Sequence, residues 1–412
     1  MPAVAAARTP LSAYQKRMLV FLSVATFFEG YDFFALAQIL PELRRDMALS
    51  EEQGSMLATV ITFGTVAAYF LVRKADVWGR RRVMTLTIAG YTLASLMTGF
   101  APNAIVFAIC QFLARIFLIG EWAVAMVYAA EEFPKERRGT VLGVIQSCAS
   151  LGAITCAGLV PILLKTAYGW RSVYFVGAIP LLIVAYARRD LKETSRFVEK
   201  EAELKAQALS MARIWKTPYK KRVLQIALLW ALCYVCTQNT TLFWKEFAVA
   251  ERSFTKAQVG LSMTIAAVGS MPLIFSSGKL LDSLGRKRGG TVIFMLSALG
   301  VYLAYSAHSL WLLTLGLVFA IFGATATLPV LNAFTTELFP TDLRSDAYAW
   351  ANNLIARTIA ALSHSVIGFS AARIGWGPSV AFTSVFLIAT IVLMWLMLPE
   401  TQGRELEETS RI

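Results

Sequence analysis

Twelve apolar stretches follow one another through this 412-residue sequence. A helix needs about 20 apolar residues to cross about 30 Å of hydrocarbon. Because a bilayer offers no water to unpaired backbone groups, such stretches can span it only as helices or as closed barrels, and their length favours helices. They lie at about 18–41, 54–73, 83–100, 104–127, 139–163, 170–187, 222–247, 258–278, 290–307, 310–333, 345–369 and 376–398. The sequence therefore predicts an all-α membrane protein with twelve transmembrane helices.

Composition supports this class and excludes others. Hydrophobic residues make up 57% of the chain and charged residues 16%, against about 45–50% and about 25% in soluble domains. These values exclude a disordered chain, a coiled coil and a small disulfide scaffold. All five cysteines lie in apolar stretches, so we expect them to pack rather than to bind metal. There is no phosphate-binding loop and no arrangement typical of a nucleophilic enzyme, so neither an enzyme nor a cofactor is expected.

The basic residues predict the orientation of the chain in the membrane. The formal net charge is +13, and 29 of the 39 Lys and Arg residues fall on one side of the predicted spans, against seven on the other. The positive-inside rule then places both termini and the long polar loop in the cytoplasm, with a bacterial inner membrane as the expected location. No nucleic-acid partner is expected, because the basic clusters are explained by topology. The N-terminus also lacks a short apolar stretch with a cleavage site, so no removable signal peptide is expected.

An internal repeat divides the chain into halves. Asp76-Val-Trp-Gly79-Arg80 recurs 206 residues later as Asp282-Ser-Leu-Gly285-Arg286. Two further matches, at Glu131 and at Gly169, have the same spacing. Six spans per half make the two repeats parallel, so they are related by an axis along the membrane normal. We therefore expect two pseudo-symmetric six-helix bundles at 1–187 and 222–412, joined by a cytoplasmic linker at 188–221.

The repeated loop motifs resemble those of the major facilitator superfamily. The second copy reads Gly278-Lys-Leu280-x-Asp282-x-x-Gly285-Arg286-Lys287, whereas the first copy has Val72 and Lys74 in place of Gly and Leu. The resemblance implies a cytoplasmic gate in which the Asp caps a helix N-terminus and the Arg pairs with an acid at the end of span 4. The gate residues would be Asp76, Gly79, Arg80, Glu131 and Arg138, with Asp282, Gly285, Arg286, Glu337 and Arg344 in the second half.

Within that superfamily the chain is most similar to the metabolite:proton symporter group. Span 1 contains Glu29-Gly-Tyr-Asp32-Phe-Phe, where the group has E-W-Y-D-F-F, so Gly30 is a departure. Span 4 contains Arg115-x-x-x-x-Gly120-Glu121-Trp122. Two segments are similar to sugar porters instead, namely Glu193-Thr-Ser-Arg-Phe and Pro399-Glu-Thr-Gln-Gly-Arg.

Charged residues within spans need a reason, because each costs about 2.5–3.5 kcal/mol at the bilayer centre. Glu29 and Asp32 lie three residues apart and so share one face of span 1. Two carboxylates on one face could carry a coupling proton, or one could be paired permanently with Arg115 or Arg357. Arg115 could likewise face a central cavity or pin span 4 to span 1.

Three cations in the spans, Arg115, Lys245 and Arg357, favour an anionic substrate, because a ligand can neutralise a buried cation. Lys245 could instead extend toward the interface. In span 11 the side chains of Asn353, Arg357 and His364 form one polar stripe. The other polar candidates within spans are Gln38, Glu121, Gln146, Gln238, Asn239 and Asn332.

These features together predict a secondary transporter that rocks around a central site and carries a small polar metabolite, an organic carboxylate, together with protons. We expect it to act as a monomer in the lipid bilayer. A sugar porter, an efflux antiporter and a non-transporting sensor are the alternatives. A sugar porter would have an Asn-, Gln- and Trp-lined cavity, an antiporter a large apolar one, and a sensor an added signalling segment.

Overall fold

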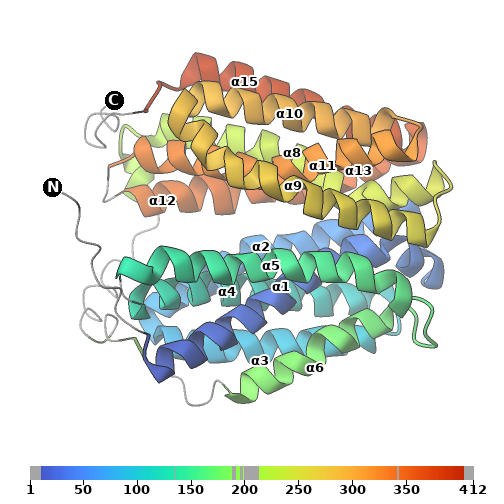
Figure 1. Ribbon diagram of the computed structural model, residues 1–412, viewed down its shortest axis with the longest axis horizontal. Helices are drawn as coiled ribbons and strands as arrows, with labels where there is room; N and C mark the ends of the chain where they lie inside the picture. Colours follow the sequence, from blue (N-terminus) through green and yellow to red (C-terminus); the bar gives the residue numbers. More distant parts are fainter. Residues whose placement is uncertain are drawn as a thin grey trace. The chain divides into compact units, whose positions relative to one another are not determined.

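The computed structural model describes residues 11–133, 135–187, 192–194, 198, 213–340 and 343–402. All regular secondary structure in these residues is helical, and twelve long helical segments follow one another in the predicted order (Figure 1). The first half contains α1 (Ala13–Asp46), α2 (Glu51–Trp78), α3 (Arg80–Gly99), α4 (Ala104–Glu132), α5 (Lys135–Leu163) and α6 (Arg171–Ala187). The second contains α8 (Lys220–Ala250), α9 (Lys256–Leu284), α10 (Arg286–Ser306), α11 (Leu310–Glu337), a segment of α12 (Arg344–Tyr348), η3 (Ala349–Ala356) and α13 (Arg357–Ile374), and a segment of α14 (Trp376–Ala381) and α15 (Ser384–Met397). The all-α prediction is confirmed.

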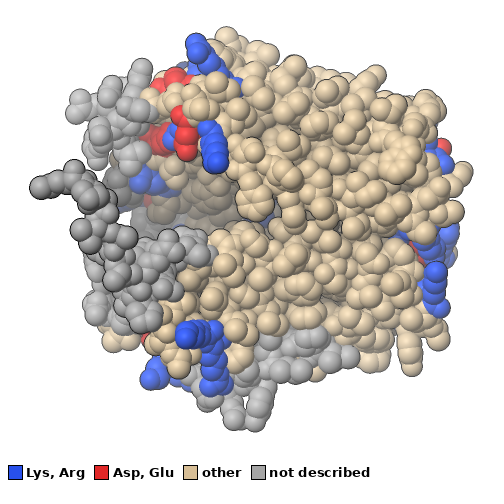
Figure 2. Space-filling view, viewed as in Figure 1, with Lys and Arg blue, Asp and Glu red and all other residues tan. Residues whose placement is uncertain are grey.

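Ten of the described segments have the length and hydropathy of a membrane span. The other two are α3, which begins with three arginines, and α6, which is described over 17 residues. Many large apolar side chains remain exposed, such as Phe275 at 76% and Leu396 at 76%. Over α9 and α10, Figure 2 shows a broad uncharged surface with the charged side chains near the helix ends. These faces therefore suit hydrocarbon rather than water.

The eleventh segment is not a continuous α-helix. Between α12 and α13, residues Ala349–Ala356 form η3, a π-helix of eight residues. A π-helix bonds each N–H to the carbonyl five residues earlier, and such turns are frequent at functional sites. The hydropathy pattern of this segment gave no sign of the interruption.

The described residues divide into two compact units. Unit 1 comprises Met1–Ala35, Ala67–Cys156 and Thr166–Leu209, and unit 2 comprises Leu36–Val66, Ala157–Lys165 and Ser210–Ile412. The boundaries run through α1, α2 and α5, so the compact units do not follow the repeat. Within unit 2, the end of α1 and the start of α2 contact later helices, for example where Thr59 and Ser365 share a hydrogen bond of 2.8 Å. The division at 188–221 thus stays a prediction.

In unit 1, α1 and α5 cross at two glycines. A Cβ on Gly30 would lie 2.0 Å from the carbonyl oxygen of Ala149, and a Cβ on Gly152 would lie 1.8 Å from that of Phe27. Neither position has room for a side chain. The departure at Gly30 therefore has a structural reason, because a tryptophan there would force the two helices apart.

In unit 2, apolar side chains of α8, α10, α11 and α15 pack into one core. Trp230, Phe294, Phe334 and Leu387 are among its fully buried members. Trp230 also donates from Nε1 to Oγ1 of Thr335 at 3.1 Å, so its polar atom is satisfied. The core therefore gives α8 a fixed position among these three helices.

Arg80 organises the loop network of the first half. Its side chain lies 3.3 Å from Glu131 and donates to the carbonyl oxygen of Ala75 at 2.9 Å. Its backbone N–H donates to Glu193 at 2.9 Å, and the hydroxyl of Thr194 donates to Glu131 at 2.6 Å. The predicted pair of Arg80 with Glu131 is confirmed.

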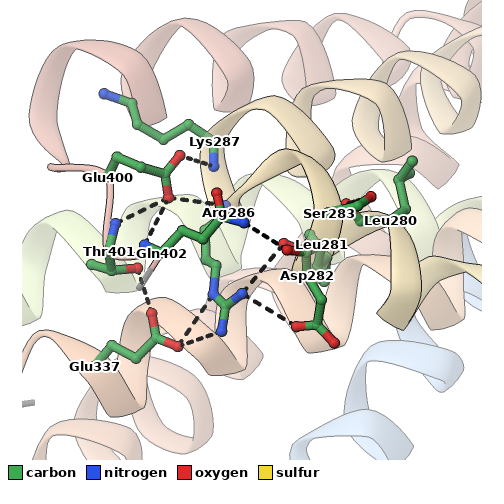
Figure 3. A network of polar contacts seen from close by, with 10 residues as sticks. All are labelled: Leu280, Leu281, Asp282, Ser283, Arg286, Lys287, Glu337, Glu400, Thr401 and Gln402. Atoms are coloured by element: carbon green, nitrogen blue, oxygen red, sulfur yellow. Dashed lines mark hydrogen bonds and ion pairs between the residues drawn. The ribbon is translucent and has the colours of Figure 1, made fainter. Parts of the chain in front are cut away.

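The second half repeats this network with Arg286 at its centre (Figure 3). Arg286 lies 3.1 Å from Glu337, and Thr401 donates a hydrogen bond to the same carboxylate. Glu400 accepts from the backbone N–H groups of Arg286 and Lys287, each at 2.9 Å. The turns before α3 and α10 match as well, because Gly79 and Gly285 have φ values of 94° and 91°, which glycine adopts readily.

The expected role of the motif aspartate needs correction. Asp282 does not cap α10; its side chain is 80% exposed and lies 3.4 Å from Arg286. The carboxylate at the N-terminus of α10 is that of Glu400, and Glu193 takes the same role at α3. An aspartate in the last turn of the preceding helix points away from the N–H groups that need acceptors. A glutamate in the segment that follows the last helix of each half can reach them.

The remaining motif residues are less informative. Arg344 donates to the carbonyl oxygen of Phe339 at 3.4 Å, and it has no carboxylate partner among the described residues. The side chains of Asp76 and Arg138 lie outside the described part of the structure.

Substituting Gly152 by alanine is expected to lower the melting temperature in detergent. The added methyl would overlap the carbonyl oxygen of Phe27, and such overpacking typically costs about 1–3 kcal/mol. Gly143 on the same helix has nothing within 4 Å of the place that a Cβ would occupy. Gly143→Ala should therefore be neutral or stabilising, since alanine is the better helix former. Equal melting temperatures for the two variants would contradict the close crossing.

Glu400 predicts a pH-dependent contribution to stability. Burial acts to raise its pKa, but hydrogen bonds from four backbone N–H groups outweigh burial and hold the pKa below its usual range. A lowered pKa stabilises the fold above the ordinary glutamate value of about 4.3, and this contribution is lost as the pH falls through the lower folded pKa. Glu400→Gln should therefore reduce stability at pH 7, by about 1 kcal/mol as for other helix caps.

The difference between Glu400→Gln and the wild type should shrink as the pH falls below the ordinary glutamate value of about 4.3 toward the lowered pKa of folded Glu400. Melting curves from pH 8 to pH 3.5 measure this. Asp282→Asn is the matched control, because it removes a negative charge from the same network around Arg286 but no helix cap. An equal loss of stability in both variants at pH 7 would count against capping by Glu400.

Candidate functional site

Glu29, Asp32, Tyr91 and Arg115 form a buried carboxylate cluster in unit 1. The two carboxylates and the guanidinium are 3%, 4% and 8% exposed. Arg115 and Tyr91 interact with Asp32, and Tyr91 also interacts with Glu29. Oδ1 of Asp32 is buried and has no hydrogen-bond donor among the described residues. The structure thus brings together Glu29, Asp32 and Arg115, and it favours the interpretation in which Arg115 links α4 to α1.

Arg115 also contacts an aromatic ring. Its guanidinium carbon lies 4.5 Å from the centroid of Phe33, within the range of cation–π interactions. Two predicted candidates lie outside the cluster as defined. Glu121 is fully buried and accepts from Oγ1 of Thr87 at 2.6 Å. Gln146 is exposed and accepts from Nε1 of Trp122 at 3.2 Å.

Lys245 has acidic partners in unit 2. Its Nζ lies 2.9 Å from Glu42, which also contacts Nζ of Lys256 at 3.3 Å. It donates a further hydrogen bond to the carbonyl oxygen of Gln38, whose side chain in turn contacts Sδ of Met263. The neighbouring Glu246 pairs with Arg44 at 3.1 Å. Lys245 is therefore already neutralised by protein, and Glu42 is a polar partner that the sequence analysis did not single out.

Arg357 lies in unit 2 at the first position of α13. Its Nε donates to Oδ1 of Asn352 at 3.2 Å, and its guanidinium carbon lies 5.7 Å from the ring centroid of Tyr234. Within the described residues it has no carboxylate partner, and its two terminal nitrogens make no hydrogen bond. Neither nitrogen belongs to the buried polar atoms that lack a hydrogen-bond partner, so both are exposed. They are therefore accessible donors.

Asn353 was predicted to lie on one stripe with Arg357, and the π-helix explains why the residue that contacts Arg357 is its neighbour Asn352. In an α-helix, residues three or four apart are neighbours on the surface, and this spacing favoured Asn353. The wider π turn aligns residues five apart, which brings Asn352 beneath Arg357. The sequence shows two adjacent asparagines, Asn352 and Asn353, but only the register of the π-helix determines which of them contacts Arg357.

His364 and Asn239 form a second polar group in unit 2. Nδ1 of His364 lies 2.8 Å from Oδ1 of Asn239, while Nδ2 of Asn239 donates to Oγ of Ser363 at 2.7 Å. The oxygen can only accept, so Nδ1 of His364 carries the hydrogen. All three side chains are buried. This geometry makes the group a satisfied internal network.

Three candidates are not joined to either group in unit 2. The side chains of Gln238 and Asn353 make no hydrogen bond within the described residues, and both are partly exposed. Oδ1 of Asn332 is buried and lacks a donor in the same part of the structure. Among the residues described, no group of three or more His, Cys, Asp or Glu could hold a metal ion.

The site chemistry is therefore that of binding and proton exchange. Unit 1 holds carboxylates beside an arginine and a tyrosine, which can exchange a proton. Unit 2 holds an arginine whose terminal nitrogens can bind an anion.

Several known transport proteins are similar to this chain over most of its length. The chain is similar to the sialic acid transporter NanX of Escherichia coli (strain K12), at 25% identity over 92% of this chain and 93% of that protein. It is 28% identical to a probable 4-methylmuconolactone transporter of Cupriavidus pinatubonensis, over 92% and 89%. It is 26% identical to a cis,cis-muconate transport protein of Acinetobacter baylyi, over 92% and 94%.

The fold is similar to that of the xylose transporter XylE from E. coli. The two structures superpose with a TM-score of 0.74, covering 95% of this chain and 98% of that one, at 17% sequence identity. The family model described as Major Facilitator Superfamily matches residues 22–248 and 240–411. The predicted resemblance is thus confirmed: the chain belongs to the Major Facilitator Superfamily, as a multi-pass secondary transporter and not an enzyme.

Proposed function

We propose that the protein carries a small organic carboxylate together with protons, and that Arg357 binds the carboxylate. The supporting observation is the state of Arg357, whose terminal nitrogens have no acceptor in the described residues. A charged group in a membrane segment needs a partner. A substrate carboxylate would provide one, and Arg–carboxylate pairs are strong because two parallel hydrogen bonds can form.

The other arginines and lysines of the spans support the choice of Arg357. Lys245 lies 2.9 Å from Glu42. Arg115 interacts with Asp32. A cation that already pairs with a carboxylate of the protein must give up that partner to bind an anionic substrate. A cation without such a partner binds the substrate with a larger gain in free energy.

The carboxylate cluster is the proposed site of proton coupling. Oδ1 of Asp32 is buried without a donor among the described residues. A buried charge with an unsatisfied oxygen is unfavourable, and binding a proton at that oxygen relieves it. Asp32 would thus bind and release the coupling proton, with Glu29 and Tyr91 as its neighbours.

The names of the relatives point the same way. Two of those compared transport sialic acid and cis,cis-muconate, which are both carboxylic acids by name. We also propose the orientation and architecture that the sequence predicts, with both termini and the linker 188–221 in the cytoplasm and bundles at 1–187 and 222–412. A bacterial inner membrane and a monomer complete the proposal.

Arg357→Gln should abolish stabilisation of the purified protein by carboxylates. Ligand binding raises the melting temperature by mass action, so cis,cis-muconate, sialic acid and xylose are screened with the wild type and the variant. We expect a shift with at least one of the two acids and none with xylose. Arg373→Gln is the matched control, because it removes the same charge from an exposed position on α13. A full shift in Arg357→Gln would overturn the proposal.

Asp32→Asn should abolish accumulation driven by a proton gradient. Proteoliposomes with an acidic exterior measure uptake of the carboxylate identified above, and exchange of labelled for unlabelled substrate measures movement without net proton transfer. We expect loss of the first and retention of the second. Asp46→Asn, at the exposed end of the same helix, is the control. Gradient-driven accumulation by Asp32→Asn at the wild-type level would exclude Asp32 as the coupling site.

A further inference from the structure

The π-helix directly before Arg357 holds this arginine by two hydrogen bonds. The backbone N–H of Arg357 donates to the carbonyl oxygen of Asn352, and its Nε donates to the side-chain oxygen of the same residue. One residue therefore fixes both the backbone and the side chain of the arginine. This double contact requires residues five apart to be neighbours, which the π turn provides.

Asn352 is itself held in one orientation. It is fully buried, and its Nδ2 donates to the hydroxyl of Tyr234 at 3.0 Å. Because Nε of Arg357 can only donate, the amide oxygen must face Arg357, and the amide nitrogen is then placed to donate to the Tyr234 hydroxyl. Tyr234 is fixed in turn, with its ring 5.3 Å from that of Trp230, whose Nε1 donates to Thr335. The core of unit 2 thus fixes the position of the Asn352 amide, and the donor Nε of Arg357 fixes which end faces the arginine.

These contacts leave one edge of the guanidinium available. Nε is used by Asn352, and the plane of the group lies near the Tyr234 ring. Nη1 and Nη2 have no acceptor within the described part of the chain. A carboxylate has two negatively charged oxygens spaced to accept from both of these nitrogens in parallel, end-on, whereas a neutral hydroxyl offers one oxygen and no charge.

We propose that Asn352 and Tyr234 are positioning residues that select carboxylates by presenting the Nη1–Nη2 edge of Arg357. This inference rests on the proposed function and extends it to how the carboxylate is recognised. Asn352 does not touch the substrate. It reserves Nε, prevents side-on binding and limits rotation of the guanidinium, so that the arginine is already arranged when the substrate arrives.

The test measures KM and kcat for uptake of cis,cis-muconate in proteoliposomes, or of sialic acid if only that acid stabilises the wild type. Asn352→Ala frees the guanidinium to rotate, and we expect KM to rise about 10-fold to 100-fold with kcat within about twofold. Tyr234→Phe removes only the hydroxyl that anchors the Asn352 amide, so KM should rise less than in Asn352→Ala. A purely structural role would lower the melting temperature and the amount of active protein without raising KM.

Asn352→Asp sharpens the test because it keeps the shape and the acceptor for Nε but adds a negative charge beside Arg357. The aspartate would pair with the guanidinium permanently, and we expect a larger rise in KM than with alanine. Thr358→Ala is the control, since among the described residues the hydroxyl of Thr358 bonds to the carbonyl of Leu354 alone. It should retain the wild-type KM.

The outcomes separate the two levels of the proposal. If Arg357→Lys and Arg357→Gln keep the wild-type KM, the proposed function is wrong. If those variants lose binding while Asn352→Ala, Asn352→Asp and Tyr234→Phe keep the wild-type KM, the positioning role is wrong and the proposed function stands. If Asn352→Ala does not fold, Tyr234→Phe and Asn352→Asp decide, and an unchanged KM in both rejects the positioning role.

Discussion

Charge within a low-dielectric membrane is the constraint on which the architecture depends. Each ionised group in a span needs a partner, and the protein meets this need in different ways. Lys245 has Glu42, and Asp32 has Arg115. At the helix ends, Arg80 and Arg286 each hold a glutamate near the end of the next helix. Arg357 is held by an amide and an aromatic ring instead, neither of which cancels its charge.

The two halves retain their symmetry at the loops and lose it within the spans. The Arg286 network reproduces the Arg80 network, down to the threonine that donates to the central glutamate. In contrast, the position 206 residues after Asp32 is Gln238, and the position 206 residues before Arg357 is Leu151. The loop network has the same mechanical role in both halves. A substrate without twofold symmetry, in contrast, does not require the same charged residue in each half.

Hydropathy was sufficient to predict the all-α fold and the twelve segments, because these follow from residue type and spacing alone, and the Arg80–Glu131 pair was implied by the resemblance of the loop motifs. The details of the site depend on register and on contacts between distant segments. Asn353 was placed on one stripe with Arg357 because α-helical spacing was assumed, and Asn352 was not singled out. Glu400 was missed as a cap, although Glu193-Thr194 and Glu400-Thr401 recur in the two halves, because no local pattern shows which N–H groups a distant carboxylate will reach.

The π-helix has a consequence for how this chain can be compared with its relatives. A π turn contains one residue more than the α-helical turn it replaces, and one residue corresponds to a rotation of about 100° around the helix axis. Every residue of α13 after Ala356 is therefore turned relative to an uninterrupted helix. In an alignment without a gap, a relative that lacks the π turn would have at the position of Arg357 a side chain on a different face of the helix. A gap of one residue in the relative's sequence would bring the matching faces into line.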